Sequence, residues 1–190
     1  FLDRYFIEYH FGSSLMGSYA GFSEFIIRIF SIVIFPITLA FHPILMNKWN
    51  KNKNIYDSLM KLFQASLIQI IIFIIMLIPL FIFKDSFFYL IQAMIPELDN
   101  SMKKIMIHIF IGGFLWQIAL VLHKPLEIEE RTLIMVVCII LSLLINLIGN
   151  IYFLPKFGIL ATGYIMIISA LTYIISSILF SKSFRKLKKR

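Results

Sequence analysis

The stretch 132–154, T-L-I-M-V-V-C-I-I-L-S-L-L-I-N-L-I-G-N-I-Y-F-L, contains no charged side chain. A helix needs about 20 residues to cross about 30 Å of hydrocarbon, and this stretch meets that length. Four other apolar blocks, 17–45, 59–83, 105–122 and 158–180, reach or nearly reach it. Their lengths and their lack of period-two alternation exclude membrane strands. The sequence therefore predicts an all-α, polytopic transmembrane helix bundle of about five spans.

The composition is typical of a chain that lipid surrounds. Hydrophobic residues make up 60% of the 190, and the mean hydropathy is +0.90, whereas soluble domains are about 45–50% apolar. The single cysteine, Cys138, lies in an apolar block, which excludes an intrachain disulfide and a cysteine-based metal site. Because the chain begins with Phe1 and not Met, we expect it to be a piece of a longer protein.

The formal charge of +8 comes from Lys and Arg between the blocks and at the C-terminus. Basic residues collect in the cytoplasmic loops of membrane proteins, and no nucleic-acid-binding signature is present, so nucleic acid is not an expected partner. Twelve basic residues lie in 46–61, 123–131 and 181–190, and the other side has five: Arg4, Lys84, Lys103, Lys104 and Lys156. This bias predicts a cytoplasmic C-terminus and, with an odd number of spans, an outer position for the N-terminal residues. Segment 84–104, which contains Phe87, Phe88, Tyr89 and Pro96 among charged residues, is predicted to lie along the outer interface as a short amphipathic segment.

Polar residues follow one face of the first block. Steps of four and three residues, interrupted only by Phe35, separate seven positions: Gly17, Gly21, Glu24, Arg28, Ser31, Thr38 and His42. At about 100° per residue they share a narrow helix face, and because a charge at mid-bilayer costs at least about 2.5–3.5 kcal/mol, that face should contact protein or water. Glu24 and Arg28 are four residues apart, which allows an ion pair. The pair is either a structural clamp between helices or part of a hydrated cavity in which Arg28 binds an ionic group such as a pyrophosphate.

The other polar residues of the spans are interpreted as packing positions. Two sets each follow one helix: Cys138, Ser142, Asn146, Gly149 and Asn150, and then Thr162, Ser169, Thr172 and Ser176. Small polar residues of this kind pack and hydrogen-bond between membrane helices. Pro36 and Pro79 should kink their blocks. The scattered histidines predict no metal site, and without a catalytic carboxylate pair or Ser/His/Asp set the sequence predicts neither a cofactor nor an enzyme.

Two stretches carry a family resemblance. The first is 1–20, F-L-D-R-Y-F-I-E-Y-H-F-G-S-S-L-M-G-S-Y-A, in which the matching residues are Asp3, Arg4, Gly12, Gly17 and Tyr19. The second is 146–164, N-L-I-G-N-I-Y-F-L-P-K-F-G-I-L-A-T-G-Y, in which they are Asn146, Asn150, Pro155, Phe157 and Gly158. Pro43, near the cytoplasmic end of the first block, matches as well. They resemble the bacterial polysaccharide flippases, which export O-antigen and capsule repeat units and belong to the multidrug/oligosaccharidyl-lipid/polysaccharide exporter superfamily. One departure is Ala161-Thr162-Gly163, where that family often has G-A-A.

The resemblance implies that residues 1–190 are the C-terminal transmembrane lobe of a two-lobe transporter whose N-terminal lobe precedes this sequence. It implies transport of an undecaprenyl-pyrophosphate-linked oligosaccharide from the inner to the outer leaflet of the bacterial inner (plasma) membrane. The expected partners are then the lipid bilayer, the lipid-linked oligosaccharide and the N-terminal lobe. The residues expected to line the substrate cavity are Glu24, Arg28, Ser31, Thr38 and Asn146.

Three alternatives stay open at this point. A multidrug or toxin exporter of the same superfamily would favour unpaired acids for binding organic cations. A membrane polysaccharide polymerase would need a larger outer loop with catalytic Arg or acidic residues than 84–104 offers. A non-functional remnant is the third, because half of a two-lobe transporter has no complete cavity.

Overall fold

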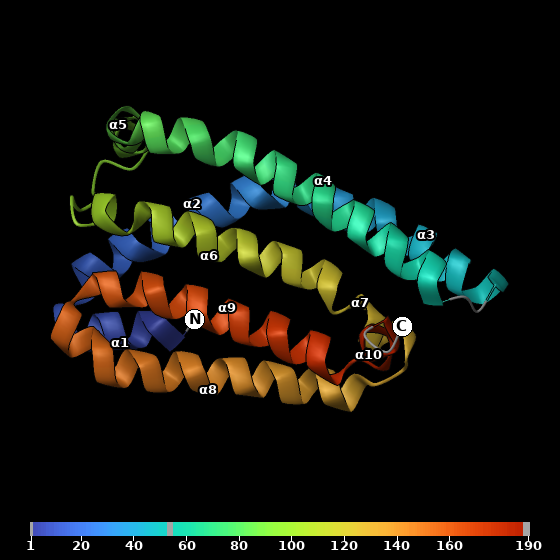
Figure 1. Cartoon of the computed structure of the whole chain (residues 1–190). Coiled ribbons are helices and arrows are strands. Elements are labelled where there is room, and N and C mark those ends of the chain that lie inside the picture. Colours follow the sequence, from blue (N-terminus) through green and yellow to red (C-terminus); the bar gives the residue numbers. More distant parts are fainter. Residues whose placement is uncertain (1, 53–54, 188–190) are drawn as a thin grey trace.

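Ten helices and no strand make up the residues that this computed structural model describes, 2–52 and 55–187 (Figure 1). In chain order the helices are α1 (Leu2–Phe11), α2 (Ser13–Val33), α3 (Phe35–Asn52), α4 (Ile55–Ile82), α5 (Lys84–Met94), α6 (Met102–Leu122), α7 (Lys124–Ile128), α8 (Thr132–Phe157), α9 (Ile159–Phe180) and α10 (Lys182–Leu187).

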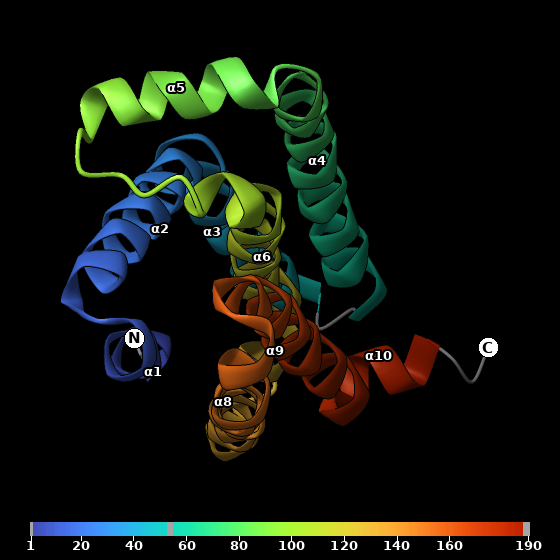
Figure 2. The same cartoon turned by 90° about the vertical axis from the view of Figure 1, so that its left-hand side faces the viewer.

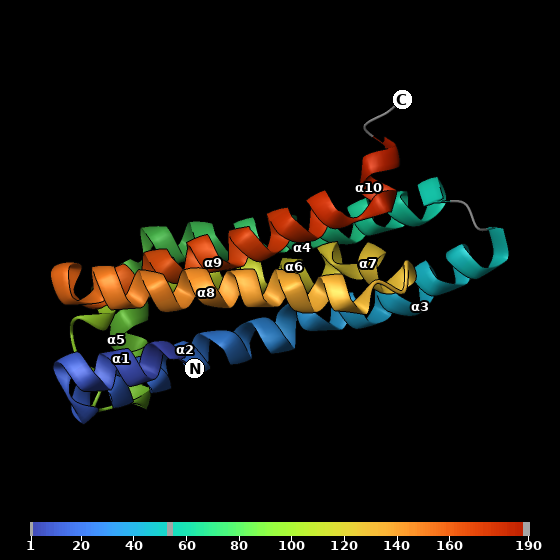
Figure 3. The ribbon, with the colours of Figure 1, turned by 90° about the horizontal axis from the view of Figure 1, so that it is seen from below.

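Five stretches are long and apolar enough to cross a membrane: Ser13–Val33, Tyr56–Ile82, Met102–Ile128, Thr132–Phe157 and Ile159–Phe180. The connections between the first three stretches contain α3 and α5, whereas short turns join the last three, and all five stretches run along the length of the bundle (Figures 1 and 3). The predicted all-α polytopic bundle is therefore confirmed, and the chain is a multi-pass membrane protein.

The first predicted block, 17–45, is not one helix. α2 ends at Val33 and α3 begins at Phe35, so the seven polar positions are divided between two helices. Pro36 has no amide hydrogen to donate to the Ile32 carbonyl, and its ring crowds that carbonyl, which explains why the helix is interrupted here. The Ile34 N–H still donates to the Phe30 carbonyl, 2.8 Å away, and the chain changes direction between α2 and α3 (Figure 1). Pro79, by contrast, lies within the continuous helix α4.

α6 is the centre of the bundle. It packs against α2, α4 and α9, while α8 packs outside α9 and also contacts α1 (Figure 2). Aromatic rings join α2, α4 and α6: the ring centroids of Phe73 and Phe114 are 3.9 Å apart, and those of Phe30 and Phe110 are 4.7 Å apart. The outward side chains of α4 and α8 are almost all large and apolar, as lipid contact requires.

The polar residues of α8 and α9 pack these helices together, as predicted. The Ser142 hydroxyl donates to the Ser169 carbonyl at 2.7 Å, and the Thr162 hydroxyl donates to Asn150 Oδ1 at 3.3 Å. A single residue, Gly158, separates the two helices, and its φ of 65° lies in the region that favours glycine. Gly163 of α9 approaches α6 so closely that an added Cβ would lie 2.7 Å from His108 Cβ.

The two ends of the bundle differ. α5 lies crosswise over one end, with Phe88 and Ile91 buried and Tyr89 and Leu90 exposed, which is the amphipathic character predicted for 84–104 (Figure 2). We call this the α5 end. The junction of α3 and α4, α7 and α10 lie at the opposite end, which we call the α10 end (Figure 3).

Glu129 attaches α10 to the α10 end. Its carboxylate accepts hydrogen bonds from the Ser181 hydroxyl at 2.7 Å and from the backbone N–H groups of Lys182, at 3.0 Å, and Ser183, at 2.7 Å. Partial burial raises the pKa of the Glu129 carboxyl, but these hydrogen bonds outweigh burial and leave the pKa below its usual value. Arg131 donates to the Phe180 carbonyl beside it.

Candidate functional site

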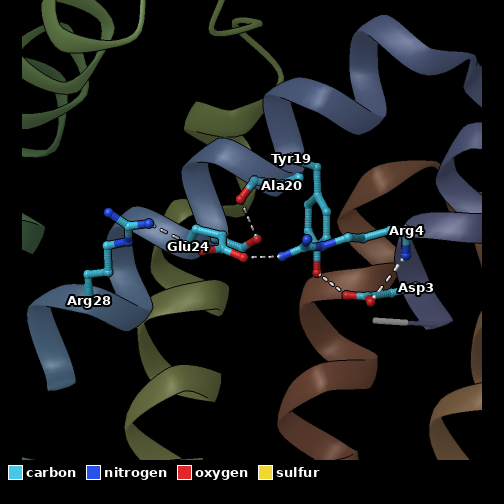
Figure 4. A network of polar contacts seen from close by, with 7 residues as sticks. Asp3, Arg4, Tyr19, Ala20, Glu24 and Arg28 are labelled. Carbon is cyan, nitrogen blue, oxygen red and sulfur yellow. Dashed lines mark hydrogen bonds and ion pairs between the residues drawn. The ribbon is translucent and has the colours of Figure 1, made fainter.

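Glu24, the acidic residue of α2, pairs more closely with Arg4 of α1 than with Arg28 of its own helix. Nη2 of Arg4 lies 3.0 Å from Oε1 of Glu24, whereas Nη2 of Arg28 lies 3.9 Å from Oε2 of the same carboxylate (Figure 4). The sequence placed Arg4 among the outer loop residues, and that prediction was wrong. Arg4 lies in a helix that packs against α2, so the charge pair inside the bundle is Arg4–Glu24, with Arg28 at its edge.

The fold of the first two helices explains this pairing. The chain reverses at Gly12, whose φ is 87°, and α1 then lies against α2 (Figure 1). The buried Tyr19 hydroxyl of α2 donates to Asp3, and the Arg4 N–H donates to Asp3 Oδ1 at 3.1 Å. The Tyr19–Asp3 hydrogen bond joins α2 to α1, and the Arg4 guanidinium lies beside Glu24 (Figure 4).

Two cavities meet at this ion pair. The first, which we call the bundle cavity, has a volume of about 520 Å³ and lies between α1, α2, α6, α8 and α9. Its polar lining consists of Asp3, Arg4, Tyr19, Ser23, Glu24, Ser142, Asn146 and Ser169, and Trp116 is its largest aromatic residue. The second, which we call the Arg28 cavity, has a volume of about 430 Å³ and is lined by Arg4, Ala20, Gly21, Glu24, Phe25, Arg28 and Ile95. Arg4 and Glu24 are the residues that line both.

The structure brings some of the predicted site residues together and separates others. Glu24 and Asn146 line the bundle cavity, and Arg28 lines the Arg28 cavity with 79% of its side chain exposed. Ser31 lies outside both cavities and donates to the Ile27 carbonyl of its own helix at 2.9 Å. Thr38 lies beyond the α2–α3 junction, where it is buried and accepts a hydrogen bond from Gln69 of α4 at 2.9 Å.

No protein-family model, curated protein or solved structure matches this chain. Its function must therefore be argued from the site and from the sequence motifs. In the part of the chain that the structure describes, no group of three or more His, Cys, Asp or Glu residues is placed to hold a metal ion. The chemistry of the site is that of paired charges, hydroxyls and one amide inside an apolar bundle.

Several cavity residues were missed by the sequence reasoning. Arg4 was counted among the basic residues of the outer side, and neither Asp3 nor Trp116 was singled out as a cavity residue. Ser142 and Ser169 were interpreted as packing residues, which they are, but they also line the bundle cavity. One signal was available for Arg4. Ionisable residues in membrane spans pair with one another, so an acidic residue such as Glu24 can have a basic partner on another helix, and Arg4 is the nearest lysine or arginine that precedes it in the sequence.

Proposed function

We propose that this chain is the C-terminal lobe of a bacterial flippase. It moves an undecaprenyl-pyrophosphate-linked oligosaccharide from the inner to the outer leaflet of the plasma membrane. The lipid tail stays in the bilayer while the polar head passes through the bundle, and the N-terminal lobe of the same chain completes the path. The family resemblance of 1–20 and 146–164 supports this proposal.

The observation that carries the proposal is Arg28. An arginine in a membrane span is costly unless it has a partner, yet Arg28 is 79% exposed and lies 3.9 Å from a carboxylate that Arg4 approaches more closely. A guanidinium binds phosphate oxygens through two parallel hydrogen bonds, so a pyrophosphate supplies what this side chain lacks.

The orientation follows from the charges at the two ends. Lys84, Lys103, Lys104 and Lys156 are the basic residues near the α5 end, now that Arg4 lies within the bundle. The α10 end has those of 46–61, 123–131 and 181–190, of which Lys53, Lys188, Lys189 and Arg190 lie outside the described residues. Positive residues stay in the cytoplasm, so we place the α10 end and the C-terminus there.

A multidrug exporter is the second candidate, and a specific observation favours it. The carboxylates of Asp3 and Glu24 line the same cavity as Trp116, and an organic cation binds both acids and aromatic faces. The Arg4 guanidinium between these acids opposes that binding, which is why we rank this candidate second.

The test compares two arginines in the full-length protein, with surface polysaccharide and membrane abundance as readouts. Arg28→Ala leaves the Arg4–Glu24 pair intact, so we expect normal abundance and lost export. Arg28→Lys keeps the charge but not the bidentate geometry, and export should fall part of the way. Arg4→Ala takes the closer partner from Glu24 and should lower abundance itself.

Normal export by Arg28→Ala at matched abundance would refute a direct role of Arg28 in substrate binding. If Arg28→Ala instead made cells more sensitive to organic cations and left surface polysaccharide unchanged, the multidrug exporter would be favoured.

A further inference from the structure

The Arg4–Glu24 pair divides the site into two cavities of unequal charge. In the bundle cavity, the carboxylates of Asp3 and Glu24 outnumber the guanidinium of Arg4. In the Arg28 cavity, the guanidinium groups of Arg4 and Arg28 outnumber the carboxylate of Glu24. An anionic group is therefore repelled from the first cavity and attracted to the second.

The hydrogen-bonding groups of the bundle cavity point to the same division. The hydroxyls of Ser23, Ser142 and Ser169 all donate to backbone carbonyls, at 3.1, 2.7 and 2.7 Å, so they offer the cavity only acceptor lone pairs. With the two carboxylates, the wall is rich in acceptors. A phosphate, which brings acceptors of its own, is a poor ligand for such a wall, whereas the hydroxyls of a sugar donate to it.

The cavity also presents a donor and an aromatic ring. Oδ1 of Asn146 accepts from Asn150 Nδ2 at 3.2 Å, and in the described part of the chain Asn146 Nδ2 donates no hydrogen bond. Trp116 lines the cavity, and Tyr173 stacks against its ring with centroids 5.7 Å apart, which supports the ring from one side. An aromatic face beside a few polar groups is a common way to bind a ligand that has both C–H and O–H groups.

We propose that the bundle cavity binds the uncharged sugar part of the ligand, with Trp116 as the ring on which the sugar packs, while the pyrophosphate stays in the Arg28 cavity. This inference rests on the proposed function for the identity of the whole ligand. What it adds is that the two parts of the ligand bind on opposite sides of the Arg4–Glu24 pair. Hydrogen-bond acceptors, the Asn146 amide donor and the Trp116 indole lie on one side, and excess positive charge lies on the other. Trp116 and Asn146 are then the residues that contact the sugar and determine which sugar binds.

The test uses cysteine protection in the full-length protein after its native cysteines, Cys138 included, are replaced. Leu143 and Leu144 are neighbours on α8 with similar exposure, 47% and 44%, but Leu143 lines the bundle cavity and Leu144 is not among its lining residues. Leu143→Cys should react with a water-soluble thiol reagent, and Leu144→Cys should react much less. Equal reaction of both, or of neither, overturns the assignment of a hydrated cavity.

Three soluble probes then compete with the reagent at Leu143→Cys. They are the repeat-unit oligosaccharide of the strain's own polysaccharide, freed of lipid and phosphate, inorganic pyrophosphate and tetraethylammonium. The oligosaccharide should protect and the other two should not. Trp116→Ala should raise the oligosaccharide concentration for half-protection about three- to tenfold, as expected for losing one aromatic contact. Trp116→Phe should have a smaller effect, and Trp49→Ala, in α3, should have none.

Each contrary result has a definite meaning. Protection by pyrophosphate overturns the charge division, protection by tetraethylammonium alone favours a cation site, and absence of any protection removes the sugar site. Because binding is measured without export, these failures are distinct from that of the proposed function. Normal export by Arg28→Ala together with oligosaccharide protection would leave the sugar site standing and remove the flippase assignment of Arg28.

Discussion

The contact between α6 and α9 at Gly163 allows a quantitative prediction. An alanine Cβ at this position would lie 2.7 Å from His108 Cβ and 3.9 Å from Ile105 Cβ. Carbon atoms in contact are about 3.5–4.0 Å apart, so the two helices would have to separate by about 1 Å. His108 Cβ is attached directly to its backbone and cannot rotate away. We therefore expect Gly163→Ala to destabilise the protein by about 1–3 kcal/mol, the usual cost of overpacking.

Two other glycines serve as controls for the same chemical change. A Cβ at Gly17 meets nothing within 4 Å, so Gly17→Ala should be neutral or slightly stabilising, because alanine favours helix over glycine. A Cβ at Gly112 would lie 2.8 Å from Met166 Cγ, which a change of rotamer can move, so Gly112→Ala should fall between the two.

The assay is unfolding of the purified protein in mixed micelles by increasing sodium dodecyl sulfate, followed by circular dichroism. At 1.4 kcal/mol per factor of ten, Gly163→Ala should lower the folded-to-unfolded ratio about 5- to 140-fold relative to Gly17→Ala. Equal stability of these two variants would show that α6 and α9 are not as close as described, and the reasoning would fail.

Two further predictions concern the ends of the bundle. Reporter fusions after Arg190 and within 47–56 should report cytoplasm, and those within 90–102 the outside; the reverse pattern would refute the orientation drawn from charge. At the α10 end, the lowered pKa of Glu129 means that its hold on α10 is complete above the usual carboxyl pKa, about 4.3, and is lost as the pH falls through the lowered pKa. A spin label at Arg185 should therefore become mobile when the pH is lowered from neutral to below the pKa of Glu129. Glu129→Gln should remove this pH dependence. A label that stays equally immobile at neutral and at acidic pH would contradict the prediction.

The spans were predictable because apolar length is a property of the sequence itself. The blocks 132–154 and 158–180 correspond to Thr132–Phe157 and Ile159–Phe180, with ends shifted by no more than a few residues. The prediction that 17–45 forms one span was wrong at one point: the run of apolar residues continues across Ile34, but the helix is interrupted there. Pro36 indicated a distortion of the helix at this place, but hydrophobicity alone cannot distinguish a bent helix from two separate helices.

The cavity was predictable only in part, because it is a product of tertiary contacts. The helical period correctly marked Glu24 and Arg28 as neighbours on one face. It could not show that Arg4, 20 residues away, lies closer to Glu24, since that depends on the reversal at Gly12. The same period grouped Ser31 and Thr38 with them, but a shared helix face became different surroundings once α2 and α3 packed against different neighbours.

The one-residue connection at Gly158 has a consequence for how the chain enters the bilayer during synthesis. α8 and α9 have no loop that would let one be inserted and the other follow later. They must partition from the translocon as a paired hairpin, with the Ser142–Ser169 hydrogen bond available to form as they leave. Between Arg131 and Lys182 the only charged residue is Lys156, beside the turn. With the α10 end in the cytoplasm, as proposed, a single ammonium group is all that this hairpin has to carry across the hydrocarbon.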